Sequence, residues 1–199
     1  MINSILTEKA VELAARRSPG WLAKLRHEAW ERAEGMQTPR HSDEYWRYTD
    51  IDMLNPDRYK SLDIAARESV LEKLPARAGS ALELKGASSG GKLVHADGAA
   101  FSAELSKEAD AKGVIFTDME TAVVKHEQLI RPRLGQLVGA SDLYTARNLA
   151  LHSGGTFIYV PDGVQLSTPL QSLHWLTAQG VIVQPRTVVV VGRGAKVVF

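Results

Sequence analysis

The clearest fold signal is the run GTFIYVPDGV at residues 155–164, a β-rich segment that ends in the turn Pro161-Asp162-Gly163. The β-rich runs of residues 154–199 are Thr156–Val160, Leu170–Leu176, Val181–Val183, Thr187–Val191 and Lys196–Phe199. Several are apolar at consecutive positions, which suits buried strands in the stacked coils of a β-helix or solenoid as well as strands of a sandwich. Stacked repeats need about three coils for stability, and this segment holds about two.

The chain ends in a strand-like run, Val197-Val198-Phe199, with no turn, cap or polar tail after it. An uncovered strand edge is a pairing hazard that natural proteins usually blunt. We therefore expect the chain to be a fragment of a longer protein, truncated within its β-rich part. We also expect the isolated fragment to self-associate through its open strand edge.

The first third of the sequence is typical of helices. Apolar residues at helical spacing predict two helices, at 4–17 and 19–34, and a further short helix is expected at 61–74. The expected caps are Asn3 or Ser4 for the first helix, Ser18 with Pro19 at the first helical position for the second, and Gly35 at its end. Two such helices cannot bury both apolar faces alone, so they must pack on another part of the chain.

Residues 36–60 predict an irregular arm, because Pro39 and Pro56 interrupt it and aromatic residues are separated by polar ones. The aromatic residues are Tyr45, Trp46, Tyr48 and Tyr59. The favoured interpretation is that these large side chains pack into a groove of the protein. A platform on which nucleic-acid bases stack would need a basic excess that the chain lacks.

The middle of the chain mixes both patterns. Strand-like runs at Ala81–Lys85, Leu93–His95 and Val114–Phe116 are separated by glycine-rich breaks. Helical spacing returns between Asp118 and Leu151 and includes Leu129, Ile130, Leu134, Leu137 and Val138, with Asp142 as a cap for its last helix. The expected fold is α+β, with a mainly helical region at 1–151 followed by a β-rich core at 152–199.

Composition excludes several classes of protein. Lys and Arg number 24 against 23 Asp and Glu, so a polybasic nucleic-acid binder is not expected. The sequence has no Cys, which excludes disulfides, thiolate metal ligands and thiol catalysis within these residues. It holds no apolar run of about 18 residues that could span a membrane, and no secretory signal is visible at Met1. A cytoplasmic protein is therefore expected.

One segment imitates a phosphate-binding loop. Residues 86–93, GASSGGKL, fit the pattern G-x-x-x-x-G-K. Such a loop needs Ser or Thr after the Lys to hold magnesium, and it must open a helix. Leu93 stands at the first of these positions, and Leu93-Val94-His95 is strand-like. We therefore expect a glycine turn rather than a nucleotide site.

The remaining chemistry-bearing residues form no recognisable site. No two of the six histidines (His27, His41, His95, His126, His152 and His174) have the spacing of a helical zinc site. His152 and His174 are separated by about one solenoid coil and could lie near each other as metal ligands, although ordinary surface or capping roles are the favoured interpretation. No paired-carboxylate site and no G-x-S-x-G nucleophile pattern is present. We therefore assign no catalytic, cofactor-binding or metal-binding residue.

Two segments of the sequence resemble the SufB/SufD family. Residues 38–50, TPRHSDEYWRYTD, are similar to an early signature of the SufD branch, P-x-x-x-x-E-x-W-R-Y-T-D. Residues 149–170 resemble the segment that opens the β-helix core of both branches, and Pro185–Val191 also fits that core. Residues 170–178, which include His174 and Trp175, again favour the SufD branch.

The resemblance implies a fold and a role. Family members have an N-terminal helical region, a right-handed parallel β-helix and a C-terminal helical region, and they are about twice this length. They are non-catalytic scaffold subunits of iron–sulfur cluster assembly that associate with a SufB-like or SufD-like paralogue and a SufC-like ATPase. Iron or an iron–sulfur cluster is thereby implied for the full complex, but the family's functional positions lie beyond Phe199. The alternative is a carbohydrate-active or small-molecule-binding β-helix protein, which would need acidic clusters where 154–199 has only Asp162.

Overall fold

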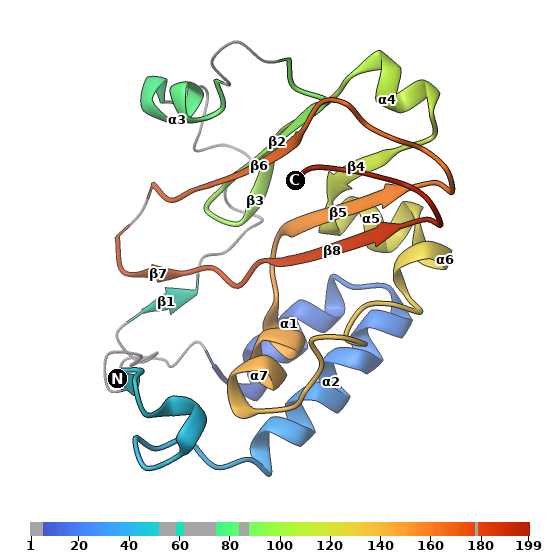
Figure 1. Cartoon of the computed structure of the whole chain (residues 1–199). Coiled ribbons are helices and arrows are strands. Elements are labelled where there is room, and N and C mark those ends of the chain that lie inside the picture. Colours follow the sequence, from blue (N-terminus) through green and yellow to red (C-terminus); the bar gives the residue numbers. More distant parts are fainter. Residues whose placement is uncertain (1–5, 52–58, 62–74, 84–87, 178) are drawn as a thin grey trace. The chain divides into compact units, whose positions relative to one another are not determined.

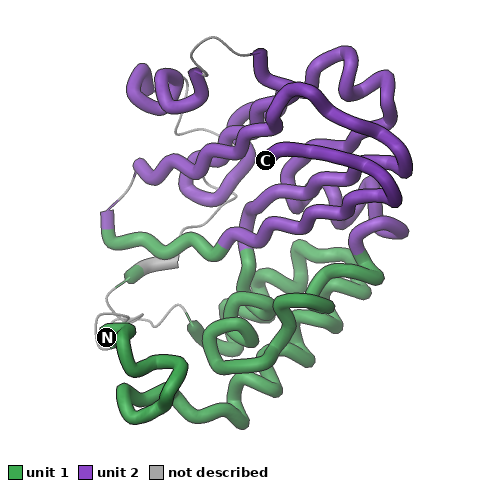
Figure 2. The backbone as a smooth tube through the Cα atoms, in the orientation of Figure 1, with its two compact units in different colours: residues 1–62, 131–152, 180–184 green, residues 63–130, 153–179, 185–199 purple. Residues whose placement is uncertain are grey.

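The structure of the chain is a computed structural model that describes residues 6–51, 59–61, 75–83, 88–177 and 179–199. These residues fall into two compact units (Figure 2). Unit 1 comprises 1–62, 131–152 and 180–184, and unit 2 comprises 63–130, 153–179 and 185–199. Helices and strands both contribute, so the expected α+β class is confirmed.

Unit 1 is built on three helices. The helices are α1 (Glu8–Arg16), α2 (Gly20–Glu34) and α7 (Leu143–Leu151), with the 3-10 turn η1 (Glu44–Trp46) and a short parallel pair of β1 (Lys60–Ser61) and β7 (Val181–Ile182). Helix α2 packs against both α1 and α7. Val11, Trp30 and Leu149 meet in the apolar core that these helices enclose.

The two predicted N-terminal helices are confirmed, but one predicted cap is wrong. Helix α1 begins after Thr7, whose side chain accepts a hydrogen bond from Ala10 N, while Asn3 and Ser4 lie outside the described residues. Pro19, not Ser18, is the N-cap of α2 and makes no side-chain cap bond. The Ser18 hydroxyl instead donates to the carbonyl of Ala14, back into the end of α1.

Unit 2 contains two three-stranded sheets (Figure 1). The first has the order β3-β2-β6, formed by β2 (Gly91–Ala96), β3 (Ala99–Leu105) and β6 (Leu170–Trp175). The second has the order β4-β5-β8, formed by β4 (Ile115–Asp118), β5 (Gly155–Val160) and β8 (Arg186–Val191). Four short helices complete the unit: α3 (Ala76–Ala81), α4 (Lys107–Ala111), α5 (Met119–Lys125) and α6 (Glu127–Ile130).

The core of unit 2 joins the two sheets. Leu93 of β2 and Leu170 of β6 pack with Phe116 of β4 and Ile158 of β5, and all four side chains are buried. Burial of large apolar side chains of this kind is the main stabilising contribution to such a unit. The consecutive apolar residues of Thr156–Val160 fit this position, because both faces of β5 are covered.

The parallel contacts in and beside the second sheet join residues that are the same number of positions apart in the chain. Strands β5 and β8 pair in parallel from Gly155↔Arg186 to Val160↔Val191, and Gln165 bridges Lys196. Both pairings are offset by 31 residues (186 minus 155, and 196 minus 165). Each sheet, however, also has an antiparallel pair, and the described strands form no closed coil. Within the described residues of unit 2, the structure thus shows small mixed sheets, and these alone do not show the expected parallel β-helix.

The turn at Asp97-Gly98 creates a strand that the sequence patterns did not predict. Both residues have positive φ, 51° and 94°, as a tight two-residue hairpin requires. The turn pairs β2 with β3 in antiparallel register from Ala96↔Ala99 onward. Asp-Gly is the strongest short hairpin signal, but β3 (AAFSAEL) is rich in small residues and lacks a clear alternation of apolar and polar residues.

Several other element predictions fail at identifiable residues. The helix expected to continue from Leu129 to Val138 ends at Ile130, because Pro132 disfavours helical geometry just before it and Gly135 has a φ of 80°. Ala81 ends helix α3 instead of starting a strand. Near the end of the chain, only Lys196 forms a bridge where a strand was expected. The predicted helix at 61–74 lies almost wholly outside the described residues.

The aromatic arm is only partly packed: the predicted burial of its rings is wrong for Tyr45 and Tyr48, whereas Trp46 and Tyr59 are half-buried. Tyr45 and Tyr48 are 96% and 93% exposed. Trp46 is half-buried, and its ring centroid lies 5.2 Å from that of Tyr144 on α7. One aromatic residue therefore holds η1 to the helices of unit 1, while its two neighbours project into solvent.

This difference predicts unequal effects of alanine substitution. Tyr45→Ala and Tyr48→Ala should each change the free energy of unfolding by less than about 0.5 kcal/mol, since neither ring is buried. Trp46→Ala should cost about 1 to 2 kcal/mol, because it removes a half-buried ring and its aromatic contact. Urea unfolding followed by circular dichroism would measure all three, and equal losses for Tyr45→Ala and Trp46→Ala would contradict the assignment.

Among the described residues, no helix is long and apolar enough to cross a membrane.

Candidate functional site

The glycine-rich segment leads into a strand. Gly91, Lys92 and Leu93 all belong to β2, as the strand-like pattern of Leu93-Val94-His95 predicts. Residues 84–87 lie outside the described part of the chain. Gly90 and Gly91 are buried, and a Cβ on Gly91 would lie 2.8 Å from the Phe116 ring. These glycines therefore allow close packing within unit 2.

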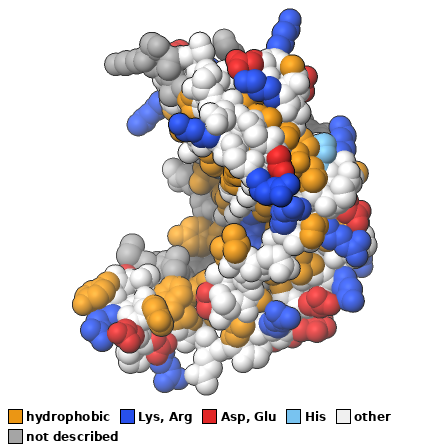
Figure 3. Space-filling model, turned by 45° about the vertical axis from the view of Figure 1, so that its right-hand side comes forward, with side chains coloured by type: hydrophobic (Ala, Val, Ile, Leu, Met, Phe, Trp, Pro, Cys, Tyr) orange, Lys and Arg blue, Asp and Glu red, His pale blue; other side chains and the backbone are white. Residues whose placement is uncertain are grey.

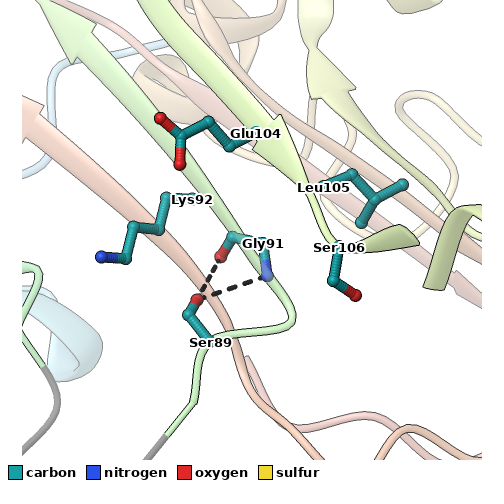
Figure 4. Close-up of a pocket in the computed structure, with 6 residues that line it drawn as sticks. All are labelled: Ser89, Gly91, Lys92, Glu104, Leu105 and Ser106. Atoms are coloured by element: carbon teal, nitrogen blue, oxygen red, sulfur yellow. Dashed lines mark hydrogen bonds between the residues drawn. The ribbon is translucent and has the colours of Figure 1, made fainter. Parts of the chain in front are cut away.

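A cavity of about 310 Å³ adjoins this segment (Figure 4). Its lining comes from the start of β2 and the end of β3 and consists of Ser89, Gly91, Lys92, Glu104, Leu105 and Ser106. The Ser89 hydroxyl donates to Gly91 O at 3.0 Å, and the Ser106 hydroxyl caps α4 by accepting from Ala109 N at 3.2 Å. Lys92 and Glu104, partners in the β2–β3 register, supply the charged groups of this cavity.

The most unusual polar cluster of unit 2 surrounds His95. His95 and His174 are register partners on the parallel strands β2 and β6, and their rings stack with centroids 4.4 Å apart and planes 5° apart. His95 is fully buried. Its Nε2 lies 3.4 Å from the Thr156 hydroxyl on β5, which in turn lies 2.9 Å from the Ser172 hydroxyl on β6. The cluster connects both sheets of unit 2.

Two pKa shifts follow from this burial. Burial, followed by the charge of His174, lowers the pKa of His95 to about 4, although Asp118 acts in the opposite direction. Burial also lowers the pKa of His174. Both rings are therefore neutral at pH 7.

Asp118 of β4 is held as a carboxylate. Burial would raise its pKa, but hydrogen bonds from Thr121 and Thr117 outweigh that effect and leave the pKa below its usual value. The Thr121 amide donates to one carboxylate oxygen at 2.8 Å, and the Thr117 hydroxyl donates to the other at 3.2 Å. Asp118 thus serves as the N-cap of α5.

The His95–His174 geometry does not suit metal binding. A ring nitrogen binds a metal along its lone pair, in the plane of the ring, and parallel stacked rings direct their lone pairs side by side rather than toward one point. In the described part of the chain, no three His, Asp or Glu side chains gather where they could hold a metal ion. The cluster is best described as a polar contact between strands, in which His95 is buried and His174 is exposed on its outer side.

His152 and His174, the two residues considered as metal ligands, belong to different units, and each has contacts within its own unit. His152 belongs to unit 1, and its Nδ1 lies 3.0 Å from Leu149 O, which places a proton on Nδ1. His174 belongs to unit 2 and stacks on His95. The spacing of the histidines in the sequence did not identify His95 as the partner of His174. The reason is that β2, which carries His95, comes from a much earlier segment of the chain than β6.

Charge on the surface is mixed. On the face shown in Figure 3, Lys and Arg side chains are interspersed with Asp and Glu. This agrees with the net charge of +1. This face therefore carries no continuous basic surface of the kind that binds nucleic acid.

One region of the chain matches a known protein family. Residues 83–172 match the family model of the SufBD protein N-terminal region. This stretch runs from the end of α3 through the β2–β3 hairpin to the start of β6, and so includes most of the two sheets of unit 2.

Similar proteins include iron–sulfur cluster assembly SufBD family proteins of Staphylococcus epidermidis (38% identical over 94 residues), Staphylococcus haemolyticus (37%) and Staphylococcus aureus (36%). Each alignment covers 47% of this chain and 20% of the relative. The chain therefore matches about a fifth of the length of these relatives. Over these residues the chain is similar to SufBD family proteins, and the matches do not distinguish SufD from SufB.

Proposed function

We propose that this chain is the N-terminal part of a non-catalytic, SufD-like scaffold subunit in cytoplasmic iron–sulfur cluster assembly. The match of residues 83–172 to the SufBD N-terminal region carries the proposal. The signature at Thr38–Asp50 lies outside that match and supports the SufD branch. Iron and the cluster are the cargo of the complex in this proposal, and the chain, which has no Cys, provides no thiolate ligand for them. No residue is assigned a catalytic, cofactor-binding or metal-binding role.

The proposal includes the finer fold expectations. The 31-residue offset of β5–β8 and Gln165–Lys196 supports a parallel β-helix that begins within 152–199. Its right-handedness, and the mainly helical region at 1–151 before it, are implied by the family resemblance. Successive coils of a solenoid would pair in parallel at a constant offset, and these two contacts are consistent with that arrangement.

The carbohydrate-active or small-molecule alternative gains no support from the described residues. Asp162, the acidic residue of 154–199, is occupied by Arg193, whose backbone amide and Nε donate to its two carboxylate oxygens at 2.9 and 3.2 Å. These residues lie in adjacent turns that follow β5 and β8. The Asp162 carboxylate therefore links two neighbouring turns through hydrogen bonds and an ion pair.

Partner association is the direct test of function. The full coding sequence should be expressed with its SufB-like paralogue and SufC-like ATPase, with an affinity tag on this chain alone. We expect a stoichiometric complex that survives gel filtration. A matched control omits the paralogue. If the tagged chain purifies without either partner, although all three proteins are present well above their cellular concentrations, the scaffold proposal is refuted.

Self-association through an open strand edge is a separate prediction; because the expected strand at Lys196–Phe199 is only a single bridge, we place that edge on β8, the last described strand. In its sheet, β8 pairs with β5 on one side, and Val189 and Val191 are 44% and 45% exposed. Exposed apolar edge strands pair with other strands unless charge or proline blocks them. The 199-residue chain should therefore form dimers or larger species as its concentration rises, as sedimentation velocity would detect.

Lysine substitution tests which surface is responsible. Val189→Lys with Val191→Lys should shift the species toward monomer by about tenfold in apparent dissociation constant. Val124→Lys is the matched control, since Val124 is 68% exposed but lies on α5. A monomeric parent chain at high concentration, or equal effects of both variants, would contradict association through β8.

A further inference from the structure

The pairing of β2 with β6 closes a long loop of the chain. It joins Gly91–Ala96 to Leu170–Trp175 in parallel register, and β6 has β2 as its neighbour in the sheet. Backbone bonds flank the pair, from Gly90 N to Pro169 O at 2.8 Å and from Asp97 N to Trp175 O at 2.7 Å. By contrast, β3 is held to β2 by a two-residue turn, so the β2–β6 contact has no local connection to support it.

The His95–His174 stack lies within this pairing. Because the rings are parallel and 4.4 Å apart, a proton on each would place two positive charges face to face. Among the described residues, the Nδ1 atom of His95 is buried without a hydrogen-bond partner. A protonated His95 would therefore bury a donor that no acceptor satisfies, which is costly.

The surroundings of the buried His95 ring offer little compensation for positive charge, whereas His174 is exposed to solvent. Three neighbouring strands contribute the residues around His95. They are its register partner Ala100 on β3, the hydroxyl of Thr156 on β5, and the His174 ring with the nearby Ser172 hydroxyl on β6. Asp118 on β4 is the acidic group that acts on His95, and its carboxylate is already engaged by Thr117 and Thr121. The two hydroxyls accept as readily as they donate, but neither carries a charge.

We propose that the His95–His174 stack makes the β2–β6 pairing a protonation-sensitive seam, which opens in acid while β5 and β8 stay paired. The described contacts of β5 and β8 contain no histidine pair, so their parallel register does not depend on this protonation. Opening would leave β2 with an unpaired edge, to which a strand from another protein could add.

The direction of the pH effect follows from the lowered pKa of His95. In the open state His95 titrates near its ordinary value of 6.5, whereas in the closed state its pKa is about 4. The open state binds more protons between these values, so the closed seam is fully favoured above about pH 6.5 and loses stability as the pH falls toward 4. His95 alone should raise the opening equilibrium roughly 70-fold between pH 7.5 and 4.5, and His174 acts in the same direction.

Amide hydrogen exchange on the 199-residue chain tests this seam. Protection factors, corrected for intrinsic exchange, should be compared at pH 7.5 and 4.5 for β2 and β6 against β5 and β8. We expect protection in β6 to fall at least roughly 70-fold more than protection in β8, because the effect of His174 adds to that of His95. A parallel fall in both sheets, or no fall in β6, would overturn the proposal.

Two further measurements keep the result specific to the stack. His174→Phe preserves a stacked ring but removes its proton, so the pH-dependent loss in β6 should become several-fold smaller. His27→Phe, at an exposed position on α2, is the matched control and should leave the loss unchanged. Ring resonances of His95 should also stay those of a neutral imidazole until β6 opens. Titration of His95 near pH 6.5 with β6 fully protected, or an unchanged loss in His174→Phe, would also overturn the proposal.

Discussion

Gly155→Ala is expected to cost more than about 4 kcal/mol of unfolding free energy, a large share of the stability of a domain of this size. Gly155 starts β5 with a φ of 120°, a conformation that side chains rarely adopt. A Cβ there would collide with the backbone carbonyl oxygen of Arg186 and lie 2.6 Å from the Arg186 amide nitrogen. Both atoms belong to β8, and backbone cannot move aside as a flexible side chain can. The substitution should therefore separate β5 from β8 at the start of their register.

Gly163→Ala separates the collision from the strain of positive φ. Gly163 has a φ of 72°, but an added Cβ would meet no atom within 4 Å. Its cost should be about 1 kcal/mol, from backbone strain alone. Urea unfolding of both variants would measure the difference, and hydrogen exchange would show whether the loss in Gly155→Ala lies in β5 and β8. A cost for Gly155→Ala no larger than that for Gly163→Ala would contradict the close approach.

Local signals in the sequence predicted the elements whose formation depends on neighbouring residues. The helical spacing before Gly35 predicted α1 and α2, and Asp142 was identified as the cap of α7, where it accepts from the amides of Tyr144 and Thr145. The β-rich runs Thr156–Val160 and Thr187–Val191 correspond to β5 and β8. Each of these signals needs only a few consecutive residues, and a side-chain cap or an apolar run is legible without the tertiary fold.

What the sequence did not predict depends on contacts between distant segments. The partner of His174 is His95, brought to it by the register of β2 and β6 across 79 positions of the chain (174 minus 95). Periodicity along one segment contains no record of such a register. The predicted burial of Tyr45 and Tyr48 is wrong for a related reason. An aromatic side chain is buried only where a groove of the fold faces its ring, and composition does not show where such a groove lies. The family resemblance, by contrast, agrees with the match to residues 83–172 because it rests on residue identities rather than on packing.

Arg26→Ala is expected to destabilise unit 1 by about 3 kcal/mol. Arg26 is 7% exposed although it carries a charge, and it lies on α2 between the ends of α1 and α7. Its Nη1 donates to Ala150 O at 2.8 Å, its Nη2 donates to His152 O at 3.0 Å, and its Nε donates to the Ser18 hydroxyl at 3.0 Å. The two carbonyls belong to the end of α7, where backbone acceptors have no helical partner. Alanine would leave these buried acceptors unsatisfied.

The geometry of the guanidinium makes this role specific to arginine. A lysine ammonium is a single point of charge and cannot place donors in the fixed fork that reaches two carbonyls and a hydroxyl at once, so Arg26→Lys should recover less than half of the loss. Arg32→Ala, on the exposed face of the same helix, is the matched control and should change stability by less than about 0.5 kcal/mol. Thermal and urea unfolding would compare the three variants. The positive charge of Arg26 also interacts favourably with the dipole at the C-terminus of α7. Because the guanidinium and its hydrogen bonds are buried, most of the loss should persist in high salt, which would screen a surface charge. Full rescue by lysine, or equal losses for Arg26→Ala and Arg32→Ala, would show that Arg26 acts only through its charge or its helix propensity and does not hold α7 in place.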